Sequence, residues 1–178
     1  MYCIQCGAIL PDMLRGENQL RCGICGHVIY GQPSPCVSIL IVSGNNVLLG
    51  LRGDTQIKPG KWCLPCGHIE RDEDFICAAA REVLEETNLH IQPISVINVV
   101  TNHFANDIHS LVVVLLARPS SADLKAGDDL AQAAWFPIDR LYPDMAFQAD
   151  IHIIEQYRKY GASFGIPLSQ TRSVFFEP

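Results

Sequence analysis

Carboxylates are concentrated in the segment 67–89, which reads GHIERDEDFICAAAREVLEETNL. Residues 72–87 contain neither proline nor glycine, are rich in alanine and begin with Asp72, a good N-cap, so we predict an α-helix there. Three glutamates then fall on one helical face, because residues three and four positions apart lie above one another. They are Glu82, Glu85 and Glu86. The opposite face is predicted to enter the core, and it consists of Ile76, Ala79, Ala80, Val83, Leu84 and Thr87.

Clustered carboxylates of this kind suit a hard divalent cation. Like charges at these spacings repel by about 0.2–0.5 kcal/mol per pair, so a cation among them would stabilise the helix. Mg²⁺ or Mn²⁺ prefers oxygen ligands, and in enzymes Mg²⁺ is commonly held by a few carboxylates together with substrate phosphates. The cluster therefore indicates phosphate chemistry. The helix by itself also fits a solvated acidic face, and that alternative stays open at this point.

The order of residues around the helix favours the first interpretation. Gly67 is followed after five residues by Glu73 and, after seven more, by REVLEETNL at 81–89. This pattern closely resembles the Nudix box, Gx5Ex7REUxEExGU with U a bulky aliphatic residue, and departs from it only at Asn88, where the box has glycine. Asparagine tolerates the left-handed conformation of a helix C-terminus better than most residues, so the turn is expected to survive. Two further glycines that are common in the family are replaced by Cys66 and Asp72.

The resemblance implies roles for the residues at matching positions. Arg81 is expected to pair with Glu85 one turn further on and to orient the cluster, and Glu73 to support or join the metal shell. A bound metal ion would neutralise charge on a pyrophosphate and help activate water for attack on phosphorus. The ion, Mg²⁺ or Mn²⁺, would be held by Glu82, Glu85, Glu86 and the carbonyl oxygen of Gly67.

Residues outside the box are candidates for substrate contacts. Arg52 ends a predicted strand before a long loop and could donate two hydrogen bonds to a phosphate, although an exposed strand-end arginine is equally consistent. Trp62 could stack on a base, but most aromatic side chains simply pack in a core. Asp128 and Asp129 lie in a polar loop of the kind that can carry a catalytic acid or base, and Asp129 is a candidate for substrate contact, although a solvated turn is the alternative. The general base varies in position among Nudix enzymes, so these two aspartates are candidates for it.

Four of the eight cysteines form two CxxC pairs separated by fifteen residues. That spacing predicts a structural zinc ribbon over residues 1–30, because two such turns can present four thiolates tetrahedrally to Zn²⁺ and leave no position for a substrate. A redox role for either pair is the lesser alternative. The zinc ligands are Cys3, Cys6, Cys22 and Cys25. A further pair, Cys63 and Cys66, carries no functional prediction.

After the ribbon, residues 31–35 (GQPSP) form a predicted linker to a catalytic domain at 36–178. Aliphatic and β-branched runs predict the strands of this domain, and an apolar stripe predicts its last helix. The strands are expected at 36–43, 47–52, 91–103, 109–118 and 131–136, and the helix at 148–160. The order is mixed α and β, and the resemblance implies the Nudix α/β/α sandwich with a mixed sheet.

The composition suits such a protein. With 178 residues, 48% of them hydrophobic and 18% charged, the chain can bury a substantial core. We expect no membrane span, because the longest aliphatic run, 111–117, is far too short, and we expect a cytoplasmic protein because a signal sequence is lacking. The net charge of −6 makes nucleic acid an unlikely partner. A homodimer is common in the family.

The resemblance implies hydrolysis of a small-molecule nucleotide, a nucleoside diphosphate linked to another moiety, with release of a nucleoside monophosphate. Zinc ribbons occur in the NADH pyrophosphatase branch, which carries SQPWPFPxS after the box. Residues 90–118 contain nothing similar, so ADP-ribose or FAD is expected first and NADH after them. The alternative is a nucleotide-sensing or RNA-binding regulator without turnover, against which the intact glutamates argue.

Overall fold

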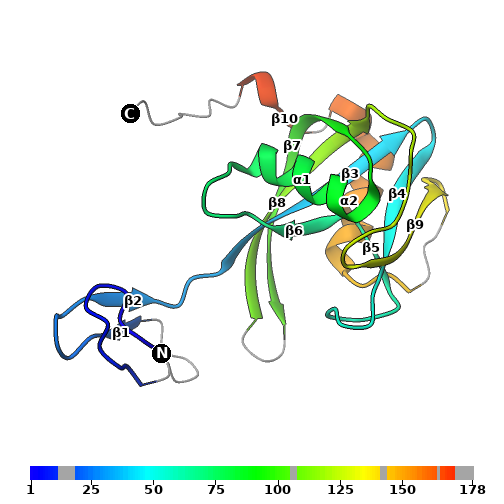
Figure 1. Ribbon diagram of the computed structural model, residues 1–178. Coiled ribbons are helices and arrows are strands. Elements are labelled where there is room, and N and C mark those ends of the chain that lie inside the picture. The colour runs from blue at the N-terminus through cyan, green and yellow to red at the C-terminus, as the bar shows by residue number, and fades with distance from the viewer. Residues whose placement is uncertain (12–18, 105–107, 141–143, 164, 171–178) are drawn as a thin grey trace.

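The computed structural model describes residues 1–11, 19–104, 108–140, 144–163 and 165–170. A small N-terminal unit is followed by a larger layered domain, and Figure 1 shows the chain passing from one to the other between β2 and β3. In the small unit, β1 (Gln19–Arg21) pairs antiparallel with β2 (Val28–Tyr30). Among its described residues, 1–11 and 19–30, the hydrophobic core holds three buried residues, Cys3, Leu10 and Cys22. This unit has too little apolar interior to fold on packing alone.

The larger domain is built on a mixed sheet. Its central strands, β3 and β8, run parallel, and the other pairs in the sheet are antiparallel. The order is β10-β7-β8-β3-β4-β5, with β6 beside β3 and β9 beside β4. The strands are β3 (Ser34–Ser43), β4 (Asn46–Arg52), β5 (Trp62–Cys63), β6 (Cys66–His68), β7 (Ile91–Phe104), β8 (Ile108–Pro119), β9 (Leu130–Pro137) and β10 (Ile166–Pro167). Short 3₁₀ turns, η1 (Gly161–Ser163) and η2 (Leu168–Gln170), flank β10.

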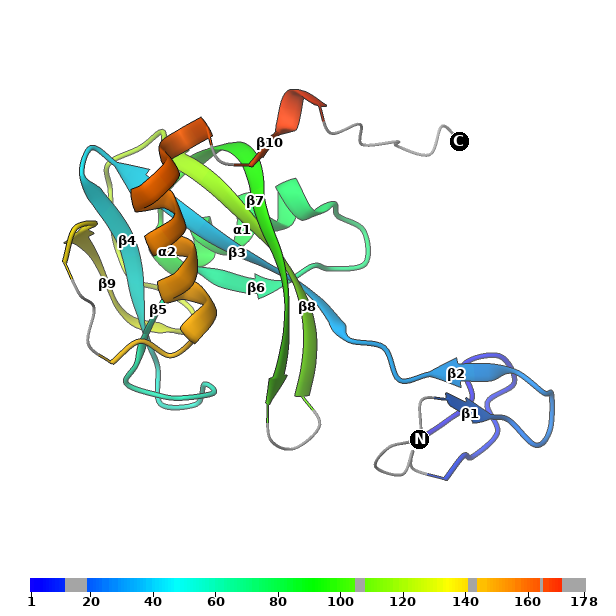
Figure 2. The same cartoon turned by 180° about the vertical axis from the view of Figure 1, so that it is seen from behind.

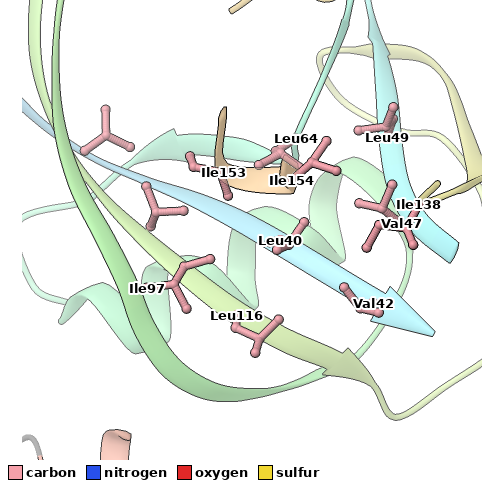
Figure 3. Packing of buried hydrophobic residues seen from close by; sticks show 12 residues of the cluster. Leu40, Val42, Val47, Leu49, Leu64, Ile97, Leu116, Ile138, Ile153 and Ile154 are labelled. Atoms are coloured by element: carbon pink, nitrogen blue, oxygen red, sulfur yellow. The ribbon is translucent and has the colours of Figure 1, made fainter. Parts of the chain in front are cut away.

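Two helices cover the two faces of this sheet. Side chains alternate along β3, so Val37, Ile39 and Ile41 pack with α1 (Phe75–Thr87) on one face. Leu40 and Val42 pack on the other face with Ile153 and Ile154 of α2 (Gln148–Tyr160). Figure 3 shows residues of this second cluster, among them Leu40 and Leu116 of the sheet and Ile153 and Ile154 of α2, and Figure 2 shows α2 in front of the sheet. The predicted α/β/α sandwich with a mixed sheet is confirmed.

Two details of the sequence prediction are wrong. The helix N-cap is Asp74, whose carboxylate oxygen Oδ1 accepts hydrogen bonds from the backbone N–H groups of Ile76 and Cys77 at 2.9 and 2.8 Å, so α1 begins later than Asp72. The linker prediction also ran too far, because β3 begins at Ser34 and pairs with β8 from there.

Neither helix of the described chain could cross a bilayer, since α1 and α2 have 13 residues each and no longer apolar helix is found there.

Candidate active site

The three glutamates of α1 differ in burial, so the helix does not present a uniformly solvated acidic face. Glu86 and Glu82 are buried, with 3% and 9% of their surface exposed, whereas the side chain of Glu85 is 47% exposed. Leu84, predicted to enter the core, is exposed instead. Tertiary contacts bury Glu82 and Glu86. Strand β6 packs against α1 on this side, and the backbone N–H of Cys66 donates a 3.1 Å hydrogen bond to Oε2 of Glu86. The carboxylates are thus placed against the sheet.

Gly67 is the point of closest approach between β6 and the helix. A β-carbon at this position would overlap the carboxyl group of Glu82. The first glycine of the box is therefore required by space, since any side chain would displace a candidate metal ligand. Its carbonyl belongs to the same short strand.

Arg81 organises the charges around this contact. Its Nη1 donates to Oε1 of Glu82 at 2.9 Å and to Oε2 of Glu85 at 3.0 Å, and its Nη2 donates to the carbonyl of His68 at 2.9 Å. Glu73 accepts from both Nε and Nη2 of Arg81, which lowers the pKa of the Glu73 carboxyl. Glu73 therefore holds the arginine, and its carboxylate also accepts from a backbone N–H in the preceding loop.

The electrostatics of the buried glutamates fit a bound cation. Burial raises the pKa of Glu86 well above its ordinary value and also raises that of Glu82. A neighbouring cation would favour the charged form of both. Among the described residues Arg81 pairs with Glu82 and Glu85, whereas no ion pair to Glu86 is found there. Three carboxylates and a carbonyl are the oxygen donors that Mg²⁺ or Mn²⁺ takes. The carboxylate oxygens of the three glutamates do not all lie within 4.8 Å of one another. Among the described residues, the four ribbon cysteines form the one group of three or more possible ligands that is this compact.

A cavity of about 200 Å³ lies beside Glu86. It runs between the α2 face of the sheet and the start of α2, and Gly67 and Glu86 form part of its wall. The cavity is also lined by Arg52, Asp129, Phe147 and Asp150. Concave, mostly apolar sites with a few polar groups are the usual form of small-molecule sites.

Arg52 is fixed within this cavity rather than exposed at a strand end. Only 9% of its surface is exposed, its Nε donates to the carbonyl of Ile57 at 2.6 Å, and its Nη2 donates to Gln56 at 3.2 Å. Its guanidinium also lies 5.2 Å from the ring centroid of Phe147. The Nη1 group lies 3.6 and 3.9 Å from the sulfurs of Cys63 and Cys66. A buried guanidinium in a cavity can bind an anionic group of a ligand.

Of the other residues predicted to contact the substrate, the aspartates lie near the site and Trp62 does not. Asp129 lines the cavity, and its carbonyl accepts from the N–H of Gly53 at 2.9 Å. Asp128 has a positive φ of 47° and its charge contributes to raising the pKa of Glu82, so it lies near the glutamates. Trp62 is not among the residues that line the cavity. Its ring packs edge-on against Phe136 with centroids 4.7 Å apart, as expected of a core aromatic residue.

Two cavity residues escaped the sequence analysis. Asp150 is buried and its Oδ2 accepts from the backbone N–H of Leu64 at 3.0 Å, and burial raises the pKa of Asp150 to about 7. Ser38 is 6% exposed, and its hydroxyl has no hydrogen-bond partner in the described structure. Both leave a signal in the sequence. Asp150 stands in helical register with the apolar Ile153 and Ile154, and Ser38 interrupts an aliphatic strand.

The four ribbon cysteines converge as predicted. Sulfur pairs lie 3.6 Å apart for Cys3 and Cys25 and 3.7 Å apart for Cys6 and Cys22. All four sulfurs lie within 4.8 Å of one another, which fits a single metal ion. Backbone N–H groups of Cys25 and Ile24 lower the pKa of the Cys22 thiol to about 6, whereas the neighbouring thiols and burial raise that of Cys6. The cluster lies in the small unit, away from the cavity residues.

Comparison with known proteins agrees with this geometry. A family model described as NUDIX domain matches residues 32–157. A protein of Yersinia enterocolitica named NAD-capped RNA hydrolase NudC is 31% identical over 141 residues, which cover 79% of this chain and 52% of that protein. A protein of the same name from Pseudomonas aeruginosa is 28% identical over 167 residues, covering 91% of this chain and 58% of that one. The chain thus spans about half the length of these curated relatives.

Among solved structures, a NUDIX hydrolase from Nitrosomonas europaea is similar with a TM-score of 0.74 and 25% sequence identity. The match covers 93% of this chain and 94% of that one, so it includes the small N-terminal unit as well as the sandwich.

Proposed function

The chain belongs to the Nudix family, and from that premise we propose that it is a hydrolase that cleaves the pyrophosphate bond of a nucleoside diphosphate linked to another moiety. The product on the nucleoside side is a nucleoside monophosphate. One observation carries the proposal: Glu86, a box glutamate, forms part of the wall of the cavity that Arg52 also lines. A candidate metal ligand and a buried cation thus face the same space, as a pyrophosphate requires.

Glu82, Glu85, Glu86 and the carbonyl of Gly67 would hold the metal of the proposed enzyme. Mg²⁺ or Mn²⁺ bound there would supply positive charge for the pyrophosphate oxygens and help activate water. The protein does the rest by position. Arg81 holds Glu82 and Glu85 in place, while Glu73 fixes Arg81. This arrangement keeps the carboxylates from separating under their own repulsion.

Arg52 is proposed to bind the phosphate on the cavity side. Its Nε and Nη2 are fixed by Ile57 and Gln56, so the guanidinium keeps its position before the substrate arrives. Its neighbours at Nη1 are thiol sulfurs, which are weak acceptors that a phosphate oxygen can replace. Asp129 lines the same cavity and remains, with Asp128, a candidate for the general base that takes the proton from the attacking water.

ADP-ribose or FAD is the proposed substrate class, ahead of NADH. The chain lacks a segment like SQPWPFPxS after the box, which argues against NADH as the preferred compound. The relatives suggest a second candidate. Their name is NAD-capped RNA hydrolase, so NAD and NAD-capped RNA are tested beside ADP-ribose and FAD. The net charge of −6 favours the free nucleotides over the RNA.

The remaining assignments complete the proposal. Zn²⁺ in the four-cysteine cluster would be structural, because four thiolates leave no open coordination position. We also propose a cytoplasmic location and, by analogy with the family, a homodimer.

A substrate panel tests the function. Purified protein is incubated with Mg²⁺ and, separately, with ADP-ribose, FAD, NADH, NAD, a short NAD-capped RNA and UDP-sugars, and the products are resolved by chromatography. Release of AMP from one compound, lost in Glu86→Gln and on addition of EDTA, is the expected result. Ligand binding without turnover and unaffected by EDTA would instead favour a nucleotide-sensing regulator.

A further inference from the structure

Two cysteines to which the sequence assigned no role, Cys63 and Cys66, meet at one guanidinium of the cavity wall. The sulfur of Cys63 lies 3.6 Å from Nη1 of Arg52, and the sulfur of Cys66 lies 3.9 Å from the same nitrogen. The Cys63 thiol is also the largest cause of the raised pKa of Cys66, so the two side chains interact directly. Both are free thiols in this structure. The two sulfurs are therefore neighbours.

The chain bends between these two cysteines. Strand β5 ends at Cys63, β6 begins at Cys66, and the bend falls at Pro65. In a straight strand, residues three positions apart are separated by about 10 Å, whereas a disulfide requires about 4.4–6.8 Å between α-carbons. The bend turns both side chains toward Arg52 and so removes the main obstacle to a bond between residues this close in the sequence.

The two thiols differ in access to small molecules. Cys66 is partly exposed and lines the cavity, whereas Cys63 has 0% of its surface exposed and is not among the lining residues. A small oxidant that enters the cavity would therefore meet Cys66 first. Arg52 supplies positive charge beside both sulfurs, and reactive cysteines typically lie in electropositive, partly exposed surroundings.

Cys66 also belongs to the scaffold of the proposed metal site. Its backbone N–H donates a 3.1 Å hydrogen bond to Oε2 of Glu86. The next residue, Gly67, approaches Glu82 so closely that a β-carbon on the glycine would overlap the carboxyl group. The backbone at these two positions therefore cannot shift without disturbing one or both carboxylates.

We propose that Cys63 and Cys66 are an oxidative modification site, at which a peroxide produces a reversible disulfide that weakens metal binding at the glutamates. The bond would draw Cys66 toward Cys63 and so pull its backbone N–H away from Glu86. The disulfide itself is independent of the proposed function. Its effect on turnover rests on that function.

The reaction with hydrogen peroxide balances in two steps. The sulfur of Cys66 takes one oxygen atom from the peroxide and becomes a sulfenic acid, and the first water is released. The sulfur of Cys63 then attacks that sulfur and displaces the hydroxyl group, which leaves with the Cys63 proton as the second water. Two thiols lose two electrons, and the peroxide gains them. Dithiothreitol reverses the change by thiol–disulfide exchange.

Peptide mapping tests the bond directly. Trypsin cleaves after Lys61 and Arg71, so both cysteines fall in one peptide that contains no other cysteine. Zinc-loaded protein is treated with a few equivalents of hydrogen peroxide at pH 8, digested, and analysed by mass spectrometry. The expected peptide has lost two hydrogen atoms and regains them with dithiothreitol. Two unmodified thiols, sulfinic acid at Cys66, or a bond from Cys66 to another cysteine would overturn the proposal.

Mn²⁺ binding, measured by isothermal titration calorimetry, tests the effect on the glutamates. Oxidised wild-type protein is expected to bind Mn²⁺ about tenfold more weakly than reduced protein, because a group that orients a candidate ligand has moved. Each variant is compared with its own reduced form. Cys63→Ser, or Cys63→Ala if the serine variant does not fold, should show no response to peroxide. Cys36→Ser, which alters another thiol of the cavity lining, should respond as the wild type does.

Three results of the calorimetry would overturn the effect on the metal site. They are equal Mn²⁺ affinity of the oxidised and reduced wild type, no Mn²⁺ binding by the reduced protein, and a peroxide response that persists in the Cys63 variants. Release of Zn²⁺, followed with a chromogenic chelator in the same samples, identifies oxidation of the ribbon cysteines as the source of such a persistent response.

Turnover separates this proposal from the proposed function. Hydrolysis in Mg²⁺ should fall by about 100-fold when the disulfide has formed and return with dithiothreitol, because the metal ligands are misplaced. A disulfide that weakens Mn²⁺ binding, with no hydrolysis of any compound in the panel, would contradict the enzyme and support the modification site. Equal hydrolysis before and after the disulfide forms would support the enzyme and overturn its control by these cysteines.

Discussion

The molecule carries two clusters of candidate metal ligands, and they relate to their surroundings in opposite ways. In the described part of the N-terminal unit the ligands make up most of the core, since Cys3 and Cys22 are two of the three buried core residues found there. In the sandwich the glutamates lie beside extensive hydrophobic clusters to which they contribute nothing apolar. A domain whose stability comes from a hydrophobic core can keep carboxylates buried and close together without a metal, because the core offsets the cost of their burial and repulsion.

This difference teaches which role each ion can take. A site whose ligands replace a core stabilises the fold and has no vacant position for chemistry. A site built on a pre-formed core can leave its ligands partly unsatisfied, as the raised pKa of Glu86 indicates, and that unsatisfied charge is available to bind an ion together with a substrate.

Loss of the cysteine cluster should have the largest effect. Structural Zn²⁺ contributes about 10–16 kcal/mol to small zinc-binding units, so Cys22→Ser or a strong chelator should unfold the N-terminal unit. The sandwich should keep its structure, because its core is separate. Loss of dispersed NMR signals from residues 1–30 alone would be the expected result. Cys77→Ser, at an exposed position on α1, is the control and should change neither part. Unfolding of both units together would contradict the contrast.

Loss of a box glutamate should lower activity without lowering stability, the opposite of what is expected for the cysteines. Glu86→Gln is expected to lower kcat/KM for the substrate found in the panel by about 10³-fold, because charge at the reacting centre is lost. It should not destabilise the metal-free protein, and should raise its urea midpoint, since a buried carboxyl that disfavours ionisation is replaced by a neutral group. Glu155→Gln makes the same change on the exposed side of α2 and serves as control. A large drop in stability with Glu86→Gln would mean that this cluster, too, holds the fold.

Asp150 gives the sandwich a pH dependence of its own. Burial raises its pKa to about 7, so between about pH 4 and pH 7 the folded protein retains a proton that the unfolded chain releases. The free energy of unfolding should therefore fall as the pH rises through this window, by about 4 kcal/mol at most from this group. Asp150→Asn should remove that part of the slope and be the more stable protein at pH 8.

Urea unfolding of the sandwich from pH 4.5 to pH 8 measures this directly. Other buried carboxyls titrate in the same direction, so the quantity to compare is the difference between Asp150→Asn and wild type, with Glu155→Gln as the charge-matched control. Parallel curves for wild type and Asp150→Asn would show that Asp150 is ionised in the folded protein throughout.

Much of this architecture follows from local sequence. The hairpin of β3 and β4 and the bounds of α2 were predictable, because alternation and helical periodicity are local properties. The burial of Glu82 and Glu86 was not, since it depends on β6 crossing a helix that begins several residues later in the chain. The same holds for Arg52, whose position is set by the loop that folds over it. Sequence patterns place side chains on faces, and tertiary contacts decide which faces meet.

The one departure from the box, Asn88, gives the smallest effect. Asn88 adopts φ 58° and ψ 14°, the left-handed conformation expected for this C-cap, and its amide donates to the backbone carbonyl of Asp123 at 3.0 Å. Asn88→Gly relaxes the backbone but loses that hydrogen bond, so the two changes should cancel to within about 0.5 kcal/mol. Asn88→Ala loses the bond and keeps a β-carbon in the left-handed region, so it should be less stable than Asn88→Gly by about 1 kcal/mol. Urea unfolding of the two variants gives the difference. Equal free energies of unfolding for Asn88→Ala and Asn88→Gly would show that the left-handed conformation of residue 88 costs nothing with a β-carbon. The hydrogen bond to Asp123 would then be what residue 88 contributes to stability.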